Sequence, residues 1–213
     1  MPVARQLSPR ALGKCQAALT AAAQLFREHG YAEVSMDAVA DGAGISKATL
    51  YSYFPGKREL FSAVILEEGD RQSADLLAPA KSGESLRTRL RRYGNAVLEL
   101  LLAGETISSY RMVVAEAARS PELGRLYYEN GAARLHARLG KVLETAMRLG
   151  ELRRGPIEVA TTQFIVLVRG DLMLRALLCV GPPVSEVERQ SAVRAGVDSF
   201  CRAWMSVSTG QIV

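Results

Sequence analysis

Apolar residues recur at helical spacing along almost the whole chain, and no stretch alternates apolar and polar residues as a half-buried strand would. Gly, Pro and Ser residues interrupt this pattern and mark where one helix ends and the next begins. The pattern predicts an all-α protein of about nine helices without a sheet. The predicted helices span approximately residues 11–29, 35–41, 46–53, 57–78, 84–103, 105–119, 120–149, 155–180 and 185–206.

The second and third predicted helices are short and closely spaced. Ser35 is a good N-cap for one and Ser46 for the other, and the Ala-Gly-Ile sequence at 43–45 supplies a tight turn between them. The Phe-Pro-Gly sequence at 54–56 then ends the third helix. Two short helices joined by a glycine-containing turn indicate a helix-turn-helix, whose second helix enters the major groove of DNA.

The predicted recognition helix can turn Leu50 and Phe54, which are four residues apart, toward the core. Small residues at its beginning allow close approach to bases, and lysines and helix N-termini suit phosphate oxygens. Burial is the alternative for its tyrosines, and simple solvation is the alternative for its lysines. The predicted DNA-binding residues are Ser35, Ser46, Lys47, Ala48, Thr49, Tyr51, Ser52, Tyr53 and Lys57.

The charge distribution supports a polyanionic partner. The chain of 213 residues has a formal net charge of +5, and residues 42–58 contain lysine and arginine but no acidic residue. The first ten residues resemble a flexible tail. Arg5 and Arg10 either belong to this tail without a role or form an arm that reaches the minor groove.

Residues 18–61 resemble the DNA-binding head of the TetR/AcrR family of bacterial regulators. The resemblance is carried by LTAAAQLF at 19–26, GY at 30–31, SMDAVA at 35–40, AGISK at 43–47 and TLYSYFPGKRELF at 49–61. The chain departs from the family pattern at Gly42, where a charged or polar residue is usual, and at Ala48, where glycine is common. Gly42 weakens its helix by about 1 kcal/mol relative to Ala.

A second resemblance, to the AefR-like subgroup, covers residues 150–204. It is carried by GELR at 150–153, VRGD at 168–171 and LRALL at 174–178. Together the resemblances imply a helix-turn-helix domain at 11–56 and a helical ligand-binding and dimerisation domain at 57–208. They also imply a homodimer in which the last two helices of each subunit together form a four-helix bundle.

The resemblance further implies a small-molecule pocket in the second domain. Aromatic side chains and a few polar ones on the helices of that domain are candidates for its lining, although each alone could equally be ordinary core or surface. The candidates are Tyr93, Tyr110, Arg111, Met112, Glu116, Tyr127, Tyr128, His136 and Phe164.

The predicted helix 155–180 is apolar nearly all round and must be covered on two sides. We expect the core to cover one side and a second subunit the other, with a larger monomeric core and an exposed patch as the alternative. The predicted dimer residues are Leu167, Asp171, Leu174, Arg175, Val193, Val197, Phe200 and Trp204.

Several classes of function lack their sequence signals. The cysteines at 15, 179 and 201 are far apart, and His136 has no second histidine within helical reach, so we expect no disulfide, metal site or cofactor. The chain has no nucleophile–base spacing and no phosphate-binding glycine loop, which argues against an enzyme or a small-molecule carrier. Charges interrupt the most apolar stretch, and no signal peptide is recognisable, so we expect a cytoplasmic protein without a membrane partner.

The sequence therefore predicts a dimeric transcriptional regulator. Its expected partners are a palindromic double-stranded DNA operator, a second copy of the chain and a small, largely hydrophobic effector that releases the repressor from DNA. The alternative is a DNA-bound regulator or scaffold that is controlled by a protein partner without a small ligand.

Overall fold

The computed structural model describes residues 8–72 and 83–206, and these residues form helices and no β-strand. The all-α prediction is confirmed. The helices are α1 (Pro9–Glu33), α2 (Met36–Gly42), α3 (Lys47–Tyr53), α4 (Lys57–Gln72), α5 (Leu86–Leu102), α6 (Gly104–Ala117), α7 (Pro121–Tyr127), the π-helix η3 (Tyr128–Ala132), α8 (Ala133–Arg148), α9 (Ile157–Arg169), α10 (Leu172–Leu177) and α11 (Glu186–Trp204).

Two of the predicted helices are interrupted. The predicted helix 120–149 contains the π-helical turn η3, which separates α7 from α8. The predicted helix 155–180 breaks at Gly170, whose φ of 51° and ψ of −133° lie outside the helical region. Residues 73–78 of the predicted fourth helix, and Arg5, lie outside the described residues.

The described residues divide into two compact units. The first comprises residues 8–71 and 104–132, and the second comprises residue 72 and residues 83–103 and 133–206. The predicted domains at 11–56 and 57–208 are defined by function and stay a prediction.

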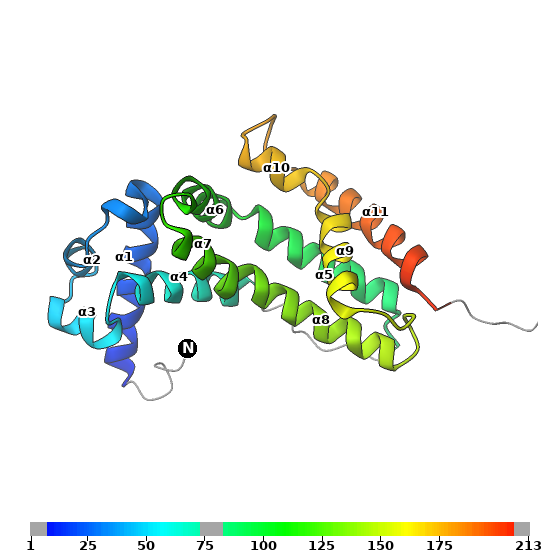
Figure 1. Cartoon of the computed structure of the whole chain (residues 1–213), viewed down its shortest axis with the longest axis horizontal. Coiled ribbons are helices and arrows are strands. Elements are labelled where there is room, and N and C mark those ends of the chain that lie inside the picture. The colour runs from blue at the N-terminus through cyan, green and yellow to red at the C-terminus, as the bar shows by residue number, and fades with distance from the viewer. Residues whose placement is uncertain (1–7, 73–82, 207–213) are drawn as a thin grey trace, which may run out of the picture. The chain divides into compact units, whose positions relative to one another are not determined.

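The core of the first unit forms around α1. The buried residues of α1 recur every three or four positions and form one stripe along the helix. Figure 1 shows α2 and α3 beside α1, and both contact it. The rings of Phe26 and Phe61 meet edge to face with their centroids 5.5 Å apart. The buried stripe of α1 consists of Cys15, Ala18, Leu19, Ala22 and Phe26.

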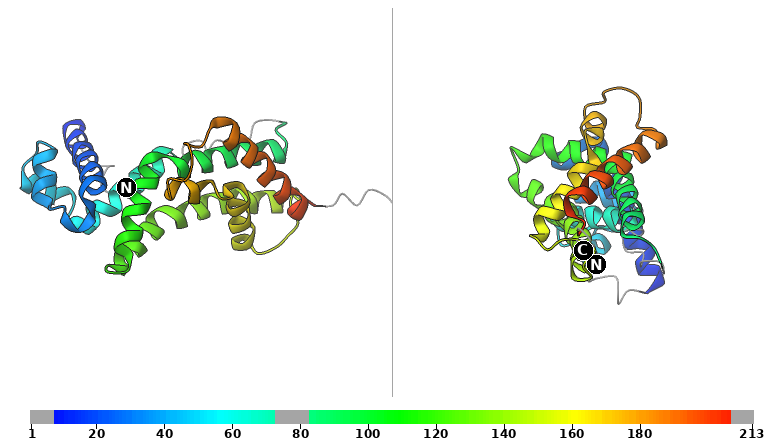
Figure 2. Two further views of the ribbon diagram at one scale, coloured as in Figure 1. Left: turned by 90° about the horizontal axis from the view of Figure 1, so that it is seen from above. Right: turned by 90° about the vertical axis from the view of Figure 1, so that its right-hand side faces the viewer.

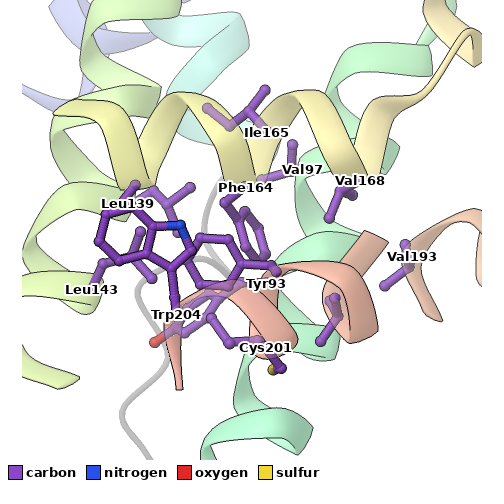
Figure 3. Packing of buried hydrophobic residues seen from close by; sticks show 14 of the residues in the cluster. Tyr93, Val97, Leu139, Leu143, Phe164, Ile165, Val168, Val193, Cys201 and Trp204 are labelled. Atoms are coloured by element: carbon purple, nitrogen blue, oxygen red, sulfur yellow. The ribbon is translucent and has the colours of Figure 1, made fainter. Parts of the chain in front are cut away.

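The core of the second unit forms around α11, which packs against α9 and α5 (Figure 2). A Cβ atom on Gly196 would lie 2.5 Å from the carbonyl oxygen of Leu167, so only glycine permits this approach of α11 to α9. Figure 3 shows Phe164 and Trp204 inside this core. The ring of Phe200 packs edge to face with that of Phe164 and stacks on that of Trp204. This core fixes which face of α9 remains exposed.

Candidate nucleic-acid interface

Serine side chains cap the N-termini of both helices of the predicted helix-turn-helix. Ser35 Oγ accepts a hydrogen bond of 3.1 Å from the backbone N–H of Ala38, and Ser46 Oγ accepts one of 3.2 Å from that of Thr49. These are N-caps, as the sequence predicted. Gly44 lies in the turn between the helices with a φ of 63°, a conformation that glycine adopts without strain.

The predicted recognition helix α3 has one buried face and one exposed face. Leu50 is fully buried and Phe54 is buried just beyond the helix, so the predicted inward pair is confirmed. Ala48 and Ser52 are exposed, and Tyr51 is 42% exposed. The outward face therefore offers small side chains at its beginning and one phenol further along, which suits close contact with base edges.

Thr49 and Tyr53 of α3 are only half-exposed. Tyr53 is half-buried against the core of the first unit, where its ring lies 6.4 Å from that of Phe54. Thr49 Oγ1 lies 2.8 Å from Ser46 Oγ, and Ser52 Oγ donates to the carbonyl oxygen of Thr49 at 2.7 Å. Tyr51 is thus the more accessible of the two tyrosines.

Lys47 is paired in the free protein. Its Nζ atom lies 2.8 Å and 3.0 Å from the two carboxylate oxygens of Asp37 on α2, and both side chains are 60% exposed. The hydrogen bond to Asp37 and the charge of that carboxylate raise the pKa of Lys47. Sequence reasoning missed this pair because ten residues and a turn separate its members. On DNA, a phosphate would compete with Asp37 for this ammonium group.

Lys57 also has partners in the free protein. Its Nζ atom donates hydrogen bonds to the carbonyl oxygens of Tyr31, Ala32 and Val34 at 2.8, 2.9 and 2.9 Å. Burial lowers the pKa of Lys57, although the charge of Glu33 acts in the opposite direction. The prediction that Lys57 contacts a phosphate requires it to leave these carbonyl groups.

A cluster of polar side chains that the sequence did not predict lies inside the first unit. Glu68 of α4 pairs with Arg27 of α1 at 3.0 Å, and Ser109 of α6 donates a hydrogen bond to it at 3.3 Å. Burial raises the pKa of Tyr127, and the charge of Glu68 raises it further. No sequence spacing signals this group, because its members come from separate helices.

The predicted pocket residues fall into both units. In the first unit, Tyr110 and Tyr127 pack edge to face at 5.9 Å. Met112 is half-buried there. Glu116 is half-buried, whereas Arg111 and Tyr128 are exposed.

In the second unit, Tyr93 and Phe164 are packed inside the core, and burial lowers the pKa of the half-buried His136. Tyr93 and Phe164 are therefore core residues in this structure, and a ligand would have to displace that packing to reach them.

The predicted dimer residues form two sets, one at least partly exposed and one buried in the core. Leu167, Asp171 and Leu174 are exposed, and Arg175 is half-buried and paired with Glu188 at 2.5 Å. The remaining four need correction as interface residues, because the core of their own subunit already covers them and leaves almost no surface for a partner. These four are Val193, Val197, Phe200 and Trp204.

Two family models match the chain. One, described as bacterial regulatory proteins of the tetR family, matches residues 18–64. The other, described as the C-terminal domain of AefR-like transcriptional repressors, matches residues 88–205. The chain belongs to the TetR family. It is therefore a helix-turn-helix transcriptional regulator that binds DNA and not an enzyme.

Relatives of this TetR-family chain align with it over most of their length. The regulator Rv1556 of Mycobacterium tuberculosis is 32% identical over 187 residues, which is 88% of this chain and 85% of the relative. The regulator YdeS of Bacillus subtilis is 31% identical over 190 residues, which is 84% of this chain and 85% of that relative.

Solved TetR-family structures have the same fold. The flavonoid-responsive regulator FrrA is 35% identical, with a TM-score of 0.77 over 90% of this chain and 97% of its own. A TetR regulator from Agrobacterium tumefaciens is 25% identical, with a TM-score of 0.76 over 94% of this chain and 96% of its own.

The described residues hold neither a metal-binding cluster nor a helix suited to a membrane. Within residues 8–72 and 83–206, no group of three or more His, Cys, Asp or Glu side chains could hold a metal ion. No helix in the described part of the chain has the length and apolar character needed to cross a membrane.

Proposed function

We propose that this TetR regulator is a homodimeric repressor that a small, largely hydrophobic ligand releases from a palindromic operator. The match of residues 88–205 to the C-terminal domain of AefR-like repressors carries the repressor part of the proposal. The activator FasR of Mycolicibacterium smegmatis is 34% identical, but over only 39% of this chain. Similarity over a part of the chain therefore does not set the sign of regulation, and the proposal rests on the match to the C-terminal domain of repressors.

The proposed dimer is supported by exposed apolar side chains on α9 and beyond it. Val166 and Leu167 lie on the face of α9 that the core leaves open, and Leu174 of α10 is 58% exposed. Exposed apolar surface of this kind is costly in a monomer and typical of an interface. Further exposed apolar side chains in the same part of the chain are Val159, Leu178, Val180 and Val187.

Introducing a charge on this face tests the dimer. We expect Val166→Glu to produce monomers in light scattering after size-exclusion chromatography, because a carboxylate cannot be buried there unpaired. Val114→Glu on α6 is the matched control, since Val114 is similarly exposed but lies in the first unit. A Val166→Glu protein that stays dimeric would contradict this interface.

A dimer would place two copies of α3 in successive major grooves about 34 Å apart. DNase footprinting on fragments selected from sheared genomic DNA tests this arrangement. We expect two protected half-sites with the wild-type protein and loss of protection with Tyr51→Ala. Tyr128→Ala is the control, because Tyr128 is also exposed but lies outside the helix-turn-helix.

The proposed effector acts by binding one conformation of the regulator better than the other. The name of FrrA says that it responds to flavonoids, and this structural relative is 35% identical. The aromatic pair Tyr110 and Tyr127, with Met112 nearby on α6, supports a flat apolar ligand.

A thermal-shift screen that includes flavonoids tests this part of the proposal, since a ligand of the native state raises the melting temperature. We expect the ligand that raises the melting temperature also to weaken the footprint. If no compound does both, control by a protein partner becomes the better hypothesis.

A further inference from the structure

Lys57 is the first residue of α4, and its ammonium group is fully used inside the protein. An ammonium group has three N–H donors. The carbonyl oxygens of Tyr31, Ala32 and Val34 accept from Lys57 Nζ at 2.8 to 2.9 Å. The same atom lies 4.8 Å from the centroid of the Tyr31 ring, over which the cation is favourably placed.

The three carbonyl groups belong to the end of α1, where such a cation is needed. These carbonyl groups follow the kink at Gly30, and carbonyl groups at the end of a helix have no partner within it. The last turn of α1 contains no basic residue, and Gly30 interrupts the helix with a φ of 80°. Lys57 therefore supplies the cation that the last turn of α1 lacks, although it lies 23 to 26 residues further along the sequence.

The position of these bonds connects three helices of the DNA-binding head. Tyr31 and Ala32 lie in α1, and Val34 directly precedes Ser35, the N-cap of α2. We propose that Lys57 is a positioning residue, which fixes the beginning of α2 and hence the orientation of α3, and does not contact a DNA phosphate. This inference rests on the proposed operator binding.

The two roles make opposite demands on the side chain. A phosphate contact needs only a positive charge, so arginine would serve as well as lysine or better. Three converging carbonyl groups need a compact ammonium, which the planar guanidinium of arginine cannot replace. The burial that lowers the pKa of Lys57 agrees with a group already withdrawn from solvent.

The first experiment compares Lys57→Arg, Lys57→Met and Lys47→Met. Each is titrated at several salt concentrations against a duplex that the wild-type protein selects from a random library. We expect both Lys57 variants to lose about tenfold in affinity. Their dependence of log Kd on log salt should match that of the wild type. Lys47→Met should reduce that slope by about 0.9 for each phosphate that the variant no longer neutralises.

Three results would overturn the proposal. One is a Lys57→Arg protein with wild-type affinity, and another is a reduced salt slope in Lys57→Met. The third is a Lys57→Met protein that melts at lower temperature but, when folded, binds as well as the wild type. Failure of the wild-type protein to bind any duplex would instead refute the operator binding on which this role depends.

The second experiment needs no variant, so it holds even if Lys57→Met fails to fold. Lysine acylation of the wild-type protein, read by mass spectrometry, should leave Lys57 unreactive both with and without the selected duplex. Lys47 should react in the free protein and be protected by DNA. A Lys57 that reacts in the free protein and becomes protected on DNA would refute the positioning role.

Discussion

The helices α3 and α11 both begin at a serine N-cap, yet they use their side chains in opposite ways. Ser46 caps α3 and Ser185 caps α11 through the same bond to the backbone N–H three residues on. Leu50 is the only buried residue within the seven-residue α3, whereas α11 buries six of its 19 residues. The helix α3 exposes most of its side chains, whereas α11 buries a continuous face.

The difference shows how a short functional helix is maintained. An isolated helix of seven residues is not stable in water, so α3 depends on its caps and on Leu50 and Phe54 in the core. The helix α11 is held by a continuous aromatic and aliphatic face. We therefore expect changes in α3 to affect DNA binding more than stability, and changes around α11 to do the reverse.

The largest effects should come from emptying either core. Phe164→Ala in the second unit and Phe26→Ala in the first each remove a fully buried ring. Each should reduce the free energy of unfolding by about 3 to 5 kcal/mol, because removal of the ring leaves a cavity. Chemical denaturation with circular dichroism measures this loss.

Cysteine alkylation can tell which core opens. Cys15 and Cys201 are buried in the first and second cores, and burial raises the pKa of both thiols, whereas Cys179 is exposed and serves as a reference. Phe164→Ala should speed the labelling of Cys201 more than that of Cys15, and Phe26→Ala the reverse. Equal acceleration of both thiols by either variant would mean that the two cores open together.

Much of the DNA-binding head could be predicted from the sequence because its signals are local. The caps at Ser35 and Ser46 act within three residues, and the inward pair of Leu50 and Phe54 follows from helical spacing. The partners of Lys47 and Lys57 could not be predicted. They lie on α2, at the end of α1 and just beyond it, and only the folded arrangement of α1 to α4 brings them together with the two lysines.

The second unit was harder to predict for a related reason. Periodicity identifies the apolar face of a helix but not what covers it. It therefore predicts Val193, Phe200 and Trp204 at a dimer interface, although their own subunit buries them. The break at Gly170 was missed because apolar residues continue on both sides of it.

A smaller effect should come from the contact between α11 and α9. Gly196→Ala places a Cβ atom against the backbone at Leu167, and forcing the helices apart should cost about 1 to 3 kcal/mol. Gly13→Ala is the control, because its Cβ atom meets nothing within 4 Å on an exposed part of α1. That variant should gain about 0.4 to 1 kcal/mol. Equal free energies of unfolding of the two variants in urea would contradict the close contact of α11 with α9 at Gly196.

The two serine caps allow the most direct comparison of α3 with α11. Ser46→Ala and Ser185→Ala should each lose about 1 kcal/mol of stability, since each removes one N-cap bond. Only Ser46→Ala should also weaken operator binding in a gel-shift titration of folded protein. A similar loss of binding in Ser185→Ala would mean that stability alone controls binding.

The smallest effect on stability, and the finest test of α3, should come from Asp37→Asn. Asp37 and Lys47 are both 60% exposed, so water screens their attraction and the melting temperature should hardly change. Operator affinity should rise, because Lys47 no longer has to leave a carboxylate to reach a phosphate. Asp37→Asn should give no such gain when Lys47→Met is also present. If the gain persists without Lys47, Asp37 opposes DNA only through its own charge, and the pair has no role in setting affinity.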